Sequence, residues 1–282
     1  KIKPSSKFFD YSTKNKPIKI IEFNEEEVEK IERNFENQRN LSKKLILIKS
    51  NENYGFAGGN NLAMKFAMNF LSVDYVLLLN NDTVVDTEFL NAMMEVAKSD
   101  DTVGFVGAKT YFYDKTNIIQ VAGGANISFK HFIVLELGLN QLDTGVYDTN
   151  YELDYISGSC ILCKKEVIEM VGMLDTKYFM YWEDADWGVR AKKLGYKSIY
   201  AYNAKIWHKV GSSSQNLFQE YYFYRNRIYF MKKNSSLVAF IKLIVYFFIF
   251  IFLPETKDRL INMRDLKGYK NYINAFLKGL TM

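Results

Sequence analysis

One acidic side chain stands where a metal ion could be held. Asp82 follows the apolar run 74–79, and Asn80 and Asn81 stand directly before it. A carboxylate fixed at the end of a buried strand can hold a divalent cation against a diphosphate, and the cation then offsets negative charge on a leaving group. Asn and Asp also close strands as simple Asx-turns. The motif therefore predicts either a metal site or a turn.

A second acidic pair, Glu183 and Asp184, lies between Trp182 and Trp187. Carboxylates at the start of a predicted helix can act merely as caps, because the helix dipole favours negative charge there. A carboxylate that accepts a proton from an attacking hydroxyl group is instead a general base, and an aromatic ring beside it suits the stacking of a sugar. Both interpretations remain open for this cluster.

Histidine is rare in this chain, and His208 stands in the stretch Trp-His-x-x-Gly-Ser-Ser after a predicted strand. It could add a nitrogen ligand to a metal ion, or it could be structural. We interpret His131 as structural. Asp186 and Arg190 are spaced i, i+4 and are expected to form a surface ion pair.

A glycine-rich turn covers residues 53–61, with the sequence Asn-Tyr-Gly-Phe-Ala-Gly-Gly-Asn-Asn. Glycines before a helix allow close approach of the backbone to a ligand. The turn is no P-loop, since it has no Gly-Lys-Ser/Thr, and it lacks the spacing of a dinucleotide fingerprint. By itself it indicates only a possible ligand contact.

The elements that must position these residues alternate between strand and helix. Predicted strands cover 44–49, 74–79, 103–107 and 198–202. Predicted helices cover 60–71, 89–98, 165–171 and a segment that opens near Glu183 and ends at Gly195. Such alternation predicts a parallel sheet with right-handed crossovers, and ligands bind at the carboxyl ends of its strands. The segment 111–155 is expected to be a β-rich excursion over the site.

The two ends of the chain differ from this pattern. Residues 1–42 are polar and predict a solvated helix or an insertion. Residues 237–253 are apolar except for Lys242, and Pro254 is expected to stop them. This segment could be an interfacial or partly inserted helix, a membrane span or a buried core helix, and its flanks are basic.

Composition limits the classes of function. The 282 residues suffice for one α/β domain with a small appendage, and the net charge of +5 suits an anionic membrane surface or a phosphate-bearing substrate. That charge is too small, and no motif is present, to predict nucleic-acid binding. Cys160 and Cys163 are expected to be reduced thiols rather than a redox pair.

Taken together and in order, these motifs resemble the family 2 glycosyltransferases, inverting enzymes of the GT-A fold, and most closely the rhamnosyltransferase-like members that build polysaccharides. The resemblance covers about residues 44–230. The matching pieces are 53–61, 78–83, 157–159, 172–175, 178–187 with Arg190, 195–196, and His208 with Gly211.

The resemblance implies a role for each motif. Asp82 matches the metal-binding aspartate of the family's Asp-x-Asp element, whose first acid is here Asn80, and His208 matches a position that often completes the site for Mn²⁺ or Mg²⁺. Asp184 matches the general base, with Glu183 beside it. The donor site is implied at Asn53, Gly55, Gly59, Asn61, Asn80 and Asn81, and sugar contacts at Gly158, Ser159, Trp182 and Trp187.

One departure from the family concerns the N-terminus. The family begins with two strands, the second of which ends in an aspartate that holds the nucleotide base, and neither strand is found in 1–42. The chain is therefore expected to lack them, with an incomplete base subsite and an open sheet edge. Because it begins with Lys1, it is also expected to be processed or a fragment.

The sequence thus predicts an α/β fold with a mostly parallel, Rossmann-like sheet flanked by helices and a C-terminal apolar helix. Its expected parts are a polar segment 1–43, a transferase domain 44–230 and a membrane-associating segment 231–282.

The expected function is metal-dependent, inverting transfer from a nucleotide-sugar to a glycan or lipid-linked acceptor, at the inner face of the cell membrane, peripheral or anchored. Two alternatives remain. One is a catalytically silent binding module at a membrane or in a complex. The other is a nucleotidyltransferase, which would need a basic glycine-rich loop near its first strand.

Overall fold

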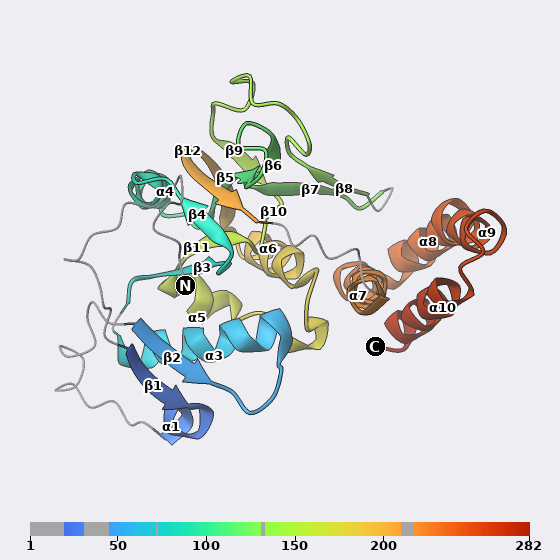
Figure 1. The fold of residues 1–282 in the computed structure, drawn as a ribbon, viewed down its shortest axis with the longest axis horizontal. Helices are drawn as coiled ribbons and strands as arrows, with labels where there is room; N and C mark the ends of the chain where they lie inside the picture. Colours follow the sequence, from blue (N-terminus) through green and yellow to red (C-terminus); the bar gives the residue numbers. More distant parts are fainter. Residues whose placement is uncertain (1–19, 31–44, 72, 131–132, 210–216) are drawn as a thin grey trace.

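The computed structural model describes residues 20–30, 45–71, 73–130, 133–209 and 217–282. A mixed seven-stranded sheet lies between helices, with a two-stranded sheet at one end and a helical C-terminal unit at the other (Figure 1). The α/β class and the C-terminal apolar helix predicted from the sequence are confirmed. His131 and Gly211 lie outside the described residues.

The central sheet has the strand order β3-β11-β5-β12-β4, with β6 paired to β5 and β9 paired to β12. Its strands are β3 Tyr75–Leu79, β4 Thr83–Val85, β5 Val103–Phe112, β6 Ile119–Ala122, β9 Tyr151–Leu153, β11 Cys160–Lys164 and β12 Lys197–His208. β5 and β12 pair in parallel, whereas β11 lies antiparallel between β3 and β5. Strands β3, β5 and β12 therefore run in the same direction.

The expectation of a mostly parallel sheet was wrong in its pairing. The excursion after β5 leaves from the carboxyl end of that strand, and β11 enters the sheet again from the same end. A strand that enters there must run antiparallel to β5, so the sheet is mixed.

Helices cover both faces of this sheet. They are α3 Gly55–Phe70, α4 Phe89–Lys98, α5 Lys165–Val171 and α6 Glu183–Lys193. On one face α4 buries Met93 against β5 and β12. On the other face side chains of α3, α5 and α6 share one core, where Trp187 packs on Phe105 at 4.6 Å between ring centroids.

A strand lies in the N-terminal segment where none was expected. β1 (Ile20–Asn24) pairs in parallel with β2 (Leu45–Lys49) as a separate two-stranded sheet, and α1 (Glu25–Lys30) follows β1. The sequence hides β1 because Glu22 interrupts its apolar residues and three glutamates follow it.

The strand β2 is only half buried. Leu45 and Leu47 are 51% and 43% exposed, whereas Ile46 and Ile48 pack beside Phe66 of α3. The expectation of a strand buried on both faces was therefore wrong, and β2 has the alternating pattern of a strand with one solvated face.

The excursion over the site is rich in β-structure, as expected. Its strands β7 (Gly124–Ser128), β8 (Ile133–Glu136) and β10 (Tyr155–Ile156) form an antiparallel sheet in the order β10-β7-β8. The buried Lys109 of β5 holds the following loop through ion pairs with Asp143 and Asp148.

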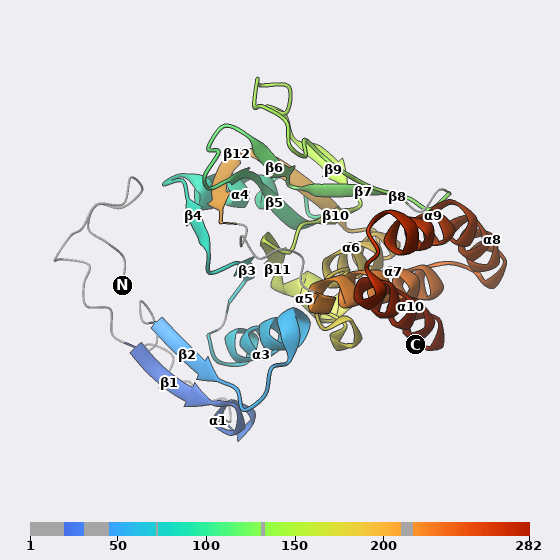
Figure 2. The same cartoon turned by 45° about the vertical axis from the view of Figure 1, so that its right-hand side comes forward.

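The C-terminal unit is helical throughout its described length. It consists of α7 Leu217–Asn234, α8 Leu237–Phe247, η3 Phe248–Phe252, α9 Leu253–Lys257, η4 Asp258–Asn262 and α10 Leu266–Thr281. Figure 2 shows α10 lying along α7.

One continuous helix runs from Leu237 to Asn262, and its 26 residues are long and apolar enough to cross a membrane. Pro254 does not stop it, because Pro254 lies in the first turn of α9 and π-helical turns on both sides absorb its missing N–H group. Leu243 and Phe247 face α7 and α10, and most of the helix is exposed. The alternative of a buried core helix is therefore excluded.

Candidate active site

The side chains of Asp82 and His208 meet at the end of the central sheet. Strand β4 pairs antiparallel with β12 and places Thr83 opposite His208. This register brings Asp82 Oδ1 to 3.1 Å from His208 Nε2, and Asn80 Nδ2 lies 3.2 Å from the same nitrogen. The two residues that the resemblance assigns to a metal site are therefore neighbours in space.

The hydrogen bonding of His208 fits a cation at this place. Its Nδ1 lies 3.0 Å from Oε1 of Gln120, an acceptor, which favours a hydrogen on Nδ1 and directs Nε2 toward Asp82. Either a proton on Nε2 or a cation held by both groups would join Nε2 to the Asp82 carboxylate. Gln120, on β6 within the excursion, was not predicted from the sequence, because no motif there marks it as a partner of His208.

A divalent cation would need ligands beyond this pair. Within the part of the chain that the structure describes, no group of three or more His, Cys, Asp or Glu side chains could hold a metal ion. Mg²⁺ commonly keeps waters and substrate phosphates as ligands and uses only one or two carboxylates. The pair thus fits a cation that shares its coordination with a diphosphate.

Asp184 lies at the first turn of α6 and accepts two backbone hydrogen bonds. The N–H groups of Gly158 and Ala185 donate to its two carboxylate oxygens, each at 2.8 Å. Burial raises the pKa of Asp184, and the backbone N–H groups oppose that shift.

The neighbouring Glu183 is buried with fewer hydrogen bonds to its carboxyl group. Its side chain is buried at 4% exposure, and Oε2 has no hydrogen-bond partner among the described residues. Burial, and then the charge of Asp184, raise the pKa of Glu183 to about 8. At neutral pH the proton therefore resides on Glu183, and Asp184 is the ionised member of the pair.

The backbone before these acids is strained. Phe179, Tyr181 and Trp182 have φ values of 66°, 67° and 74°, in the left-handed region that non-glycine residues rarely adopt. Such strain persists only where the surroundings impose it, and it is concentrated at functional sites.

Two residues of α7 impose this conformation, and the sequence did not reveal them. Nδ2 of the fully buried Asn226 lies within 2.9 Å of the carbonyl oxygens of Tyr178, Met180 and Tyr181. Arg225 Nη2 donates to the carbonyl oxygens of Lys177 and Tyr178. A buried Arg-Asn pair within a helix would have been the only signal.

The loop 157–159 links the two acidic groups. The N–H group of Asn80 donates to the carbonyl oxygen of Ser159 at 3.1 Å, and Gly158 N–H donates to Asp184. Cys160, the next residue, pairs with Leu79 at the end of β3. Asp82 and Asp184 therefore lie at the same end of β3 and β11, a hundred positions apart in the sequence.

The glycine-rich turn packs against the strained segment. A Cβ atom on Gly55, where φ is +68°, would lie 2.3 Å from the carbonyl oxygen of Phe179, and Ala57 N–H donates to that oxygen. A Cβ on Gly158 would lie 3.3 Å from the Phe56 ring and 3.4 Å from Asp184 Oδ2. The turn thus borders the same site.

Part of this turn is helix, because α3 begins at Gly55 rather than at residue 60. Asn53 Oδ1 accepts from Gly55 N–H, and the Asn61 amide exchanges two hydrogen bonds with the backbone of Leu174. The side chains of Asn53 and Asn61 thus already form hydrogen bonds with the protein backbone. Gly59 has open space beside its Cα atom, and Asn81 is exposed.

Neither predicted tryptophan offers a face to a sugar. Trp187 is 1% exposed, and its Nε1 donates to the carbonyl oxygen of Gly172. Trp182 is 7% exposed and packs on Phe223 and Phe230 of α7. The expectation of sugar stacking is corrected: both rings belong to the hydrophobic cores that hold α6.

Asp186 and Arg190 form an ion pair at 2.8 Å, but it is not at the surface. Asp186 is completely buried and also accepts from Lys233 Nζ and the Tyr178 hydroxyl. This network ties α6 to α7. The thiols of Cys160 and Cys163 are free and buried, as expected of reduced cysteines.

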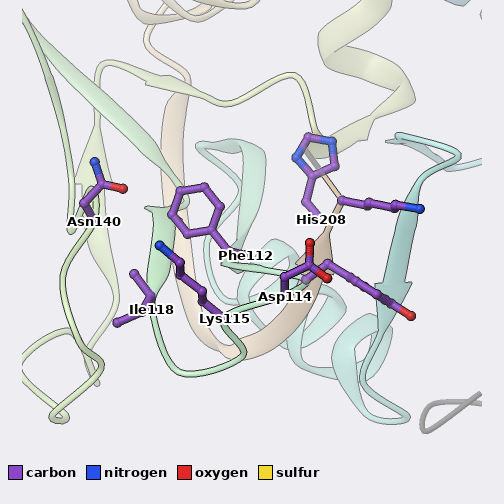
Figure 3. A pocket seen from close by; sticks show the side chains of 8 residues that line it. Phe112, Asp114, Lys115, Ile118, Asn140 and His208 are labelled. Carbon is purple, nitrogen blue, oxygen red and sulfur yellow. The ribbon is translucent and has the colours of Figure 1, made fainter. Parts of the chain in front are cut away.

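A cavity of about 600 Å³ adjoins His208. Figure 3 shows His208 on one side of it and Asn140 on the other. The lining residues are Phe112, Tyr113, Asp114, Lys115, Ile118, Asn140, His208 and Lys209. Its size is that of a small-molecule site, and its charged lining residues are Lys115, Lys209 and Asp114.

Comparison with known proteins identifies relatives of the chain. A family model described as glycosyltransferase like family 2 matches residues 12–227, starting well before the expected domain boundary at 44. The low-salt glycan biosynthesis hexosyltransferase Agl10 of Haloferax volcanii is 23% identical over 146 residues, which cover 52% of this chain and 46% of that protein.

A rhamnosyltransferase of Mycobacterium tuberculosis that acts on N-acetylglucosaminyl-diphospho-decaprenol is 40% identical over 60 residues, 21% of this chain and 20% of that protein. The chain thus spans less than half the length of these relatives. The crystal structure of GalNAc-T7 with UDP, GalNAc and Mn²⁺ matches with a TM-score of 0.51 at 11% identity, over 70% of this chain and 38% of that one. That likeness shows a shared fold.

Proposed function

We propose that this chain, which belongs to glycosyltransferase-like family 2, transfers a sugar from a nucleotide-sugar to a hydroxyl group of a glycan or lipid-linked acceptor, with inversion. The observation that carries the proposal is the link through residues 157–159, by which one loop bonds both to Asn80 beside the metal pair and to Asp184. A donor diphosphate at Asp82 would then have its anomeric carbon within reach of an acceptor held at Asp184.

The chemistry is a single displacement. The acceptor oxygen forms a bond to the anomeric carbon, the bond from that carbon to the diphosphate oxygen breaks, and the acceptor proton passes to Asp184. Glu183 stays protonated and leaves Asp184 as the base. Asp82 and His208 would hold a Mn²⁺ or Mg²⁺ ion, which supplies positive charge for the departing nucleoside diphosphate.

Support for a metal comes from His208 Nε2, which lies 3.1 Å from Asp82 Oδ1, and from the GalNAc-T7 structure of the same fold, which was solved with Mn²⁺. The nearby lysines of the cavity, Lys115 and Lys209, suit a phosphate-bearing ligand.

The proposal is tested by titrating the chain calorimetrically with UDP-, GDP- and dTDP-sugars, with and without Mn²⁺. We expect binding of at least one of them that depends on Mn²⁺ and is lost in Asp82→Ala. Absence of metal-dependent binding to all three would instead favour a silent binding module.

We also propose that the helix Leu237–Asn262 holds the protein at the inner face of the cell membrane, peripheral or anchored, near a lipid-linked acceptor. Its outward face is apolar along several turns. The exposed side chains include Leu237, Val238, Ile241, Val245, Ile249, Phe250 and Leu253. An apolar face flanked by basic residues partitions into an anionic lipid interface.

A further inference from the structure

Tyr155 and Glu136 occupy matching positions on the two outer strands of the three-stranded sheet in the excursion. In the order β10-β7-β8, Tyr155 lies opposite Ala125, and Ala125 lies opposite Glu136. Residues directly opposed on neighbouring antiparallel strands project to the same face of a sheet. The side chain between them is the methyl group of Ala125, which is fully buried, so Tyr155 and Glu136 stand on either side of it on one face.

The same face of this sheet packs on α6. A Cβ atom on Gly188 would lie 2.5 Å from Cβ of Tyr155, so the strand and the helix are in close contact there. Asp184 precedes Gly188 by four residues and lies on the same side of the helix. Val134, two residues before Glu136 on β8, packs against the apolar cluster that includes side chains of α6. Glu136 and Tyr155 therefore face Asp184.

The electrostatics agree with this placement. Burial, and then the charge of Asp184, raise the pKa of Glu136. Burial, and then the charges of Asp184, Glu136 and Glu183, raise the pKa of Tyr155. The phenol thus stands among three carboxyl groups that come from β8 and from the start of α6.

These groups lack partners within the protein. Among the described residues, none makes a hydrogen bond or an ion pair with the Glu136 carboxylate or the Tyr155 hydroxyl. The buried Oε2 of Glu183 is also without a partner. An enclosed polar atom that remains unpaired, such as Oε2 of Glu183, costs free energy that a ligand with a matching group removes. The Glu136 side chain is exposed, so its carboxylate can accept a hydrogen bond from a ligand that enters from solvent.

The cluster does not suit a single cation. No three acids in the described part of the chain lie close enough to hold one metal ion. Several hydroxyl groups on one ligand would instead serve carboxylates that are spread apart, and a sugar ring carries its hydroxyl groups in that way. One of these hydroxyl groups would be the one that Asp184 deprotonates.

We propose that Glu136 and Tyr155 bind the acceptor sugar, with Glu136 accepting a hydrogen bond from a hydroxyl group near the attacking one and Tyr155 donating to an oxygen of the same sugar. The inference rests on the proposed function and assigns its acceptor class, a sugar bound through at least two hydroxyl groups. Glu136 is thus a specificity-determining residue of the acceptor site.

The test uses the full chain with Mn²⁺ and, as probes, the methyl glycosides of glucose, galactose, mannose and N-acetylglucosamine, each titrated calorimetrically. For the glycoside that binds tightest we expect Glu136→Gln to raise Kd about tenfold, the loss typical of one hydrogen bond to a charged group. Tyr155→Phe should raise Kd by a smaller factor, and Glu136→Asp should restore part of the affinity. Glu95→Gln, on α4 across the sheet, is the matched control and should leave Kd as it is.

Two outcomes overturn the inference: wild-type binding by Glu136→Gln, or no binding of any of the four glycosides by the wild type. A third outcome, equal weakening of nucleotide-sugar and glycoside binding by Glu136→Gln, would also overturn it, because Glu136 would then act on the whole site. Failure of the proposed function is distinguishable from these, since a wild type that binds a glycoside but no nucleotide-sugar contradicts only the transferase proposal.

Discussion

At the scale of single residues, the adjacent acids Glu183 and Asp184 differ in their surroundings and therefore in their tendency to ionise. Oε2 of the buried Glu183 has no hydrogen-bond partner among the described residues, whereas Asp184 accepts from the backbone N–H groups of Gly158 and Ala185. Two carboxyl groups so close together do not ionise equally, and the one that accepts more hydrogen bonds keeps the charge. This difference supports the proposed role of Asp184 as the base, with Glu183 as its neutral neighbour.

This difference makes stability depend on pH. In the unfolded chain Glu183 loses its proton near the ordinary carboxyl pKa, and in the folded chain only near 8, so the folded state binds more protons between about pH 5 and 8. Stability should fall as pH rises through that window, by up to about 1.4 kcal/mol per pH unit for this group. Urea unfolding at pH 5.5, 6.5 and 7.5 measures the slope. Glu183→Gln should flatten it, and equal slopes in wild type and variant would contradict the assignment.

A second residue-scale prediction concerns Gln120, which orients His208 through Nδ1. Gln120→Leu removes the acceptor that fixes the tautomer, and such outer partners of a metal ligand typically contribute about 10–100-fold to metal affinity. Mn²⁺ titration followed by electron paramagnetic resonance should show a loss of that size. Gln141→Leu, at an exposed glutamine of the neighbouring loop, is the control, and similar affinities in both variants would argue against a metal on His208.

At the scale of elements, α7 acts as the clamp for the segment that presents the acids. Three carbonyl oxygens of that segment meet one amide group of Asn226. The positive φ angles at Phe179, Tyr181 and Trp182 need this support, because an unconstrained chain would relax toward negative φ. The clamp connects the helical C-terminal unit to the chemistry.

Asn226→Ala should therefore lower the free energy of unfolding by about 2–3 kcal/mol, since it leaves buried carbonyl oxygens without donors. Asn234→Ala is the matched control on the same helix. The Asn234 amide donates at 3.3 Å to Asp186 and to the carbonyl oxygen of Phe230, and it accepts an exposed hydrogen bond of 3.1 Å from Lys193, so its loss should cost below about 1 kcal/mol. Urea unfolding measures the free energy of unfolding of both variants. Equal decreases would contradict a special contribution of the Asn226 amide to stability.

Elements with a strong local pattern could be predicted from the sequence. Helix α4 has the predicted bounds 89–98, and α5 ends at Gly172 as predicted. The direction of β11 was missed because it depends on where the excursion leaves the sheet, which no local pattern records. Strand β1 was missed because it is only five residues long, Glu22 interrupts its apolar residues, and three glutamates follow it.

The candidate site shows the same division. Residue type and position, at strand ends for Asp82 and His208 and at a helix start for Asp184, singled out side chains that the structure brings to one end of the sheet. Their catalytic roles stay predictions. The burial of Trp182 and Trp187 depends on how α6 packs between Phe105 and α7, which is a tertiary property. Asn226 acts through backbone carbonyl groups forty-five to forty-eight positions away and left no motif.

At the scale of the whole molecule, the apolar outward face of helix Leu237–Asn262 is a separate functional surface. Ile241 and Val245 lie one turn apart on this face, each about half exposed. The opposite side is fixed to α7 by the buried Arg259, which pairs with Glu220 and Glu255. The outward face can therefore be changed without disturbing the clamp.

The double variant Ile241→Gln/Val245→Gln should bind vesicles of anionic phospholipid at least about tenfold more weakly than wild type, because two aliphatic side chains no longer enter the lipid. Sedimentation with phosphatidylglycerol vesicles measures the partition. Leu194→Gln, at an exposed leucine after α6, is the control. Equal partition of all three proteins would exclude this face as the membrane contact.

The rate of sugar transfer by Asp184→Asn decides whether the two acidic groups act on one bound donor. It is measured as release of nucleoside diphosphate at saturating Mn²⁺ and nucleotide-sugar, with the best-bound methyl glycoside as acceptor. We expect a rate about 10²–10⁴-fold below wild type, with Kd for the nucleotide-sugar changed less than threefold. A rate near that of wild type would contradict the role of Asp184 and, with it, the proposed transferase mechanism.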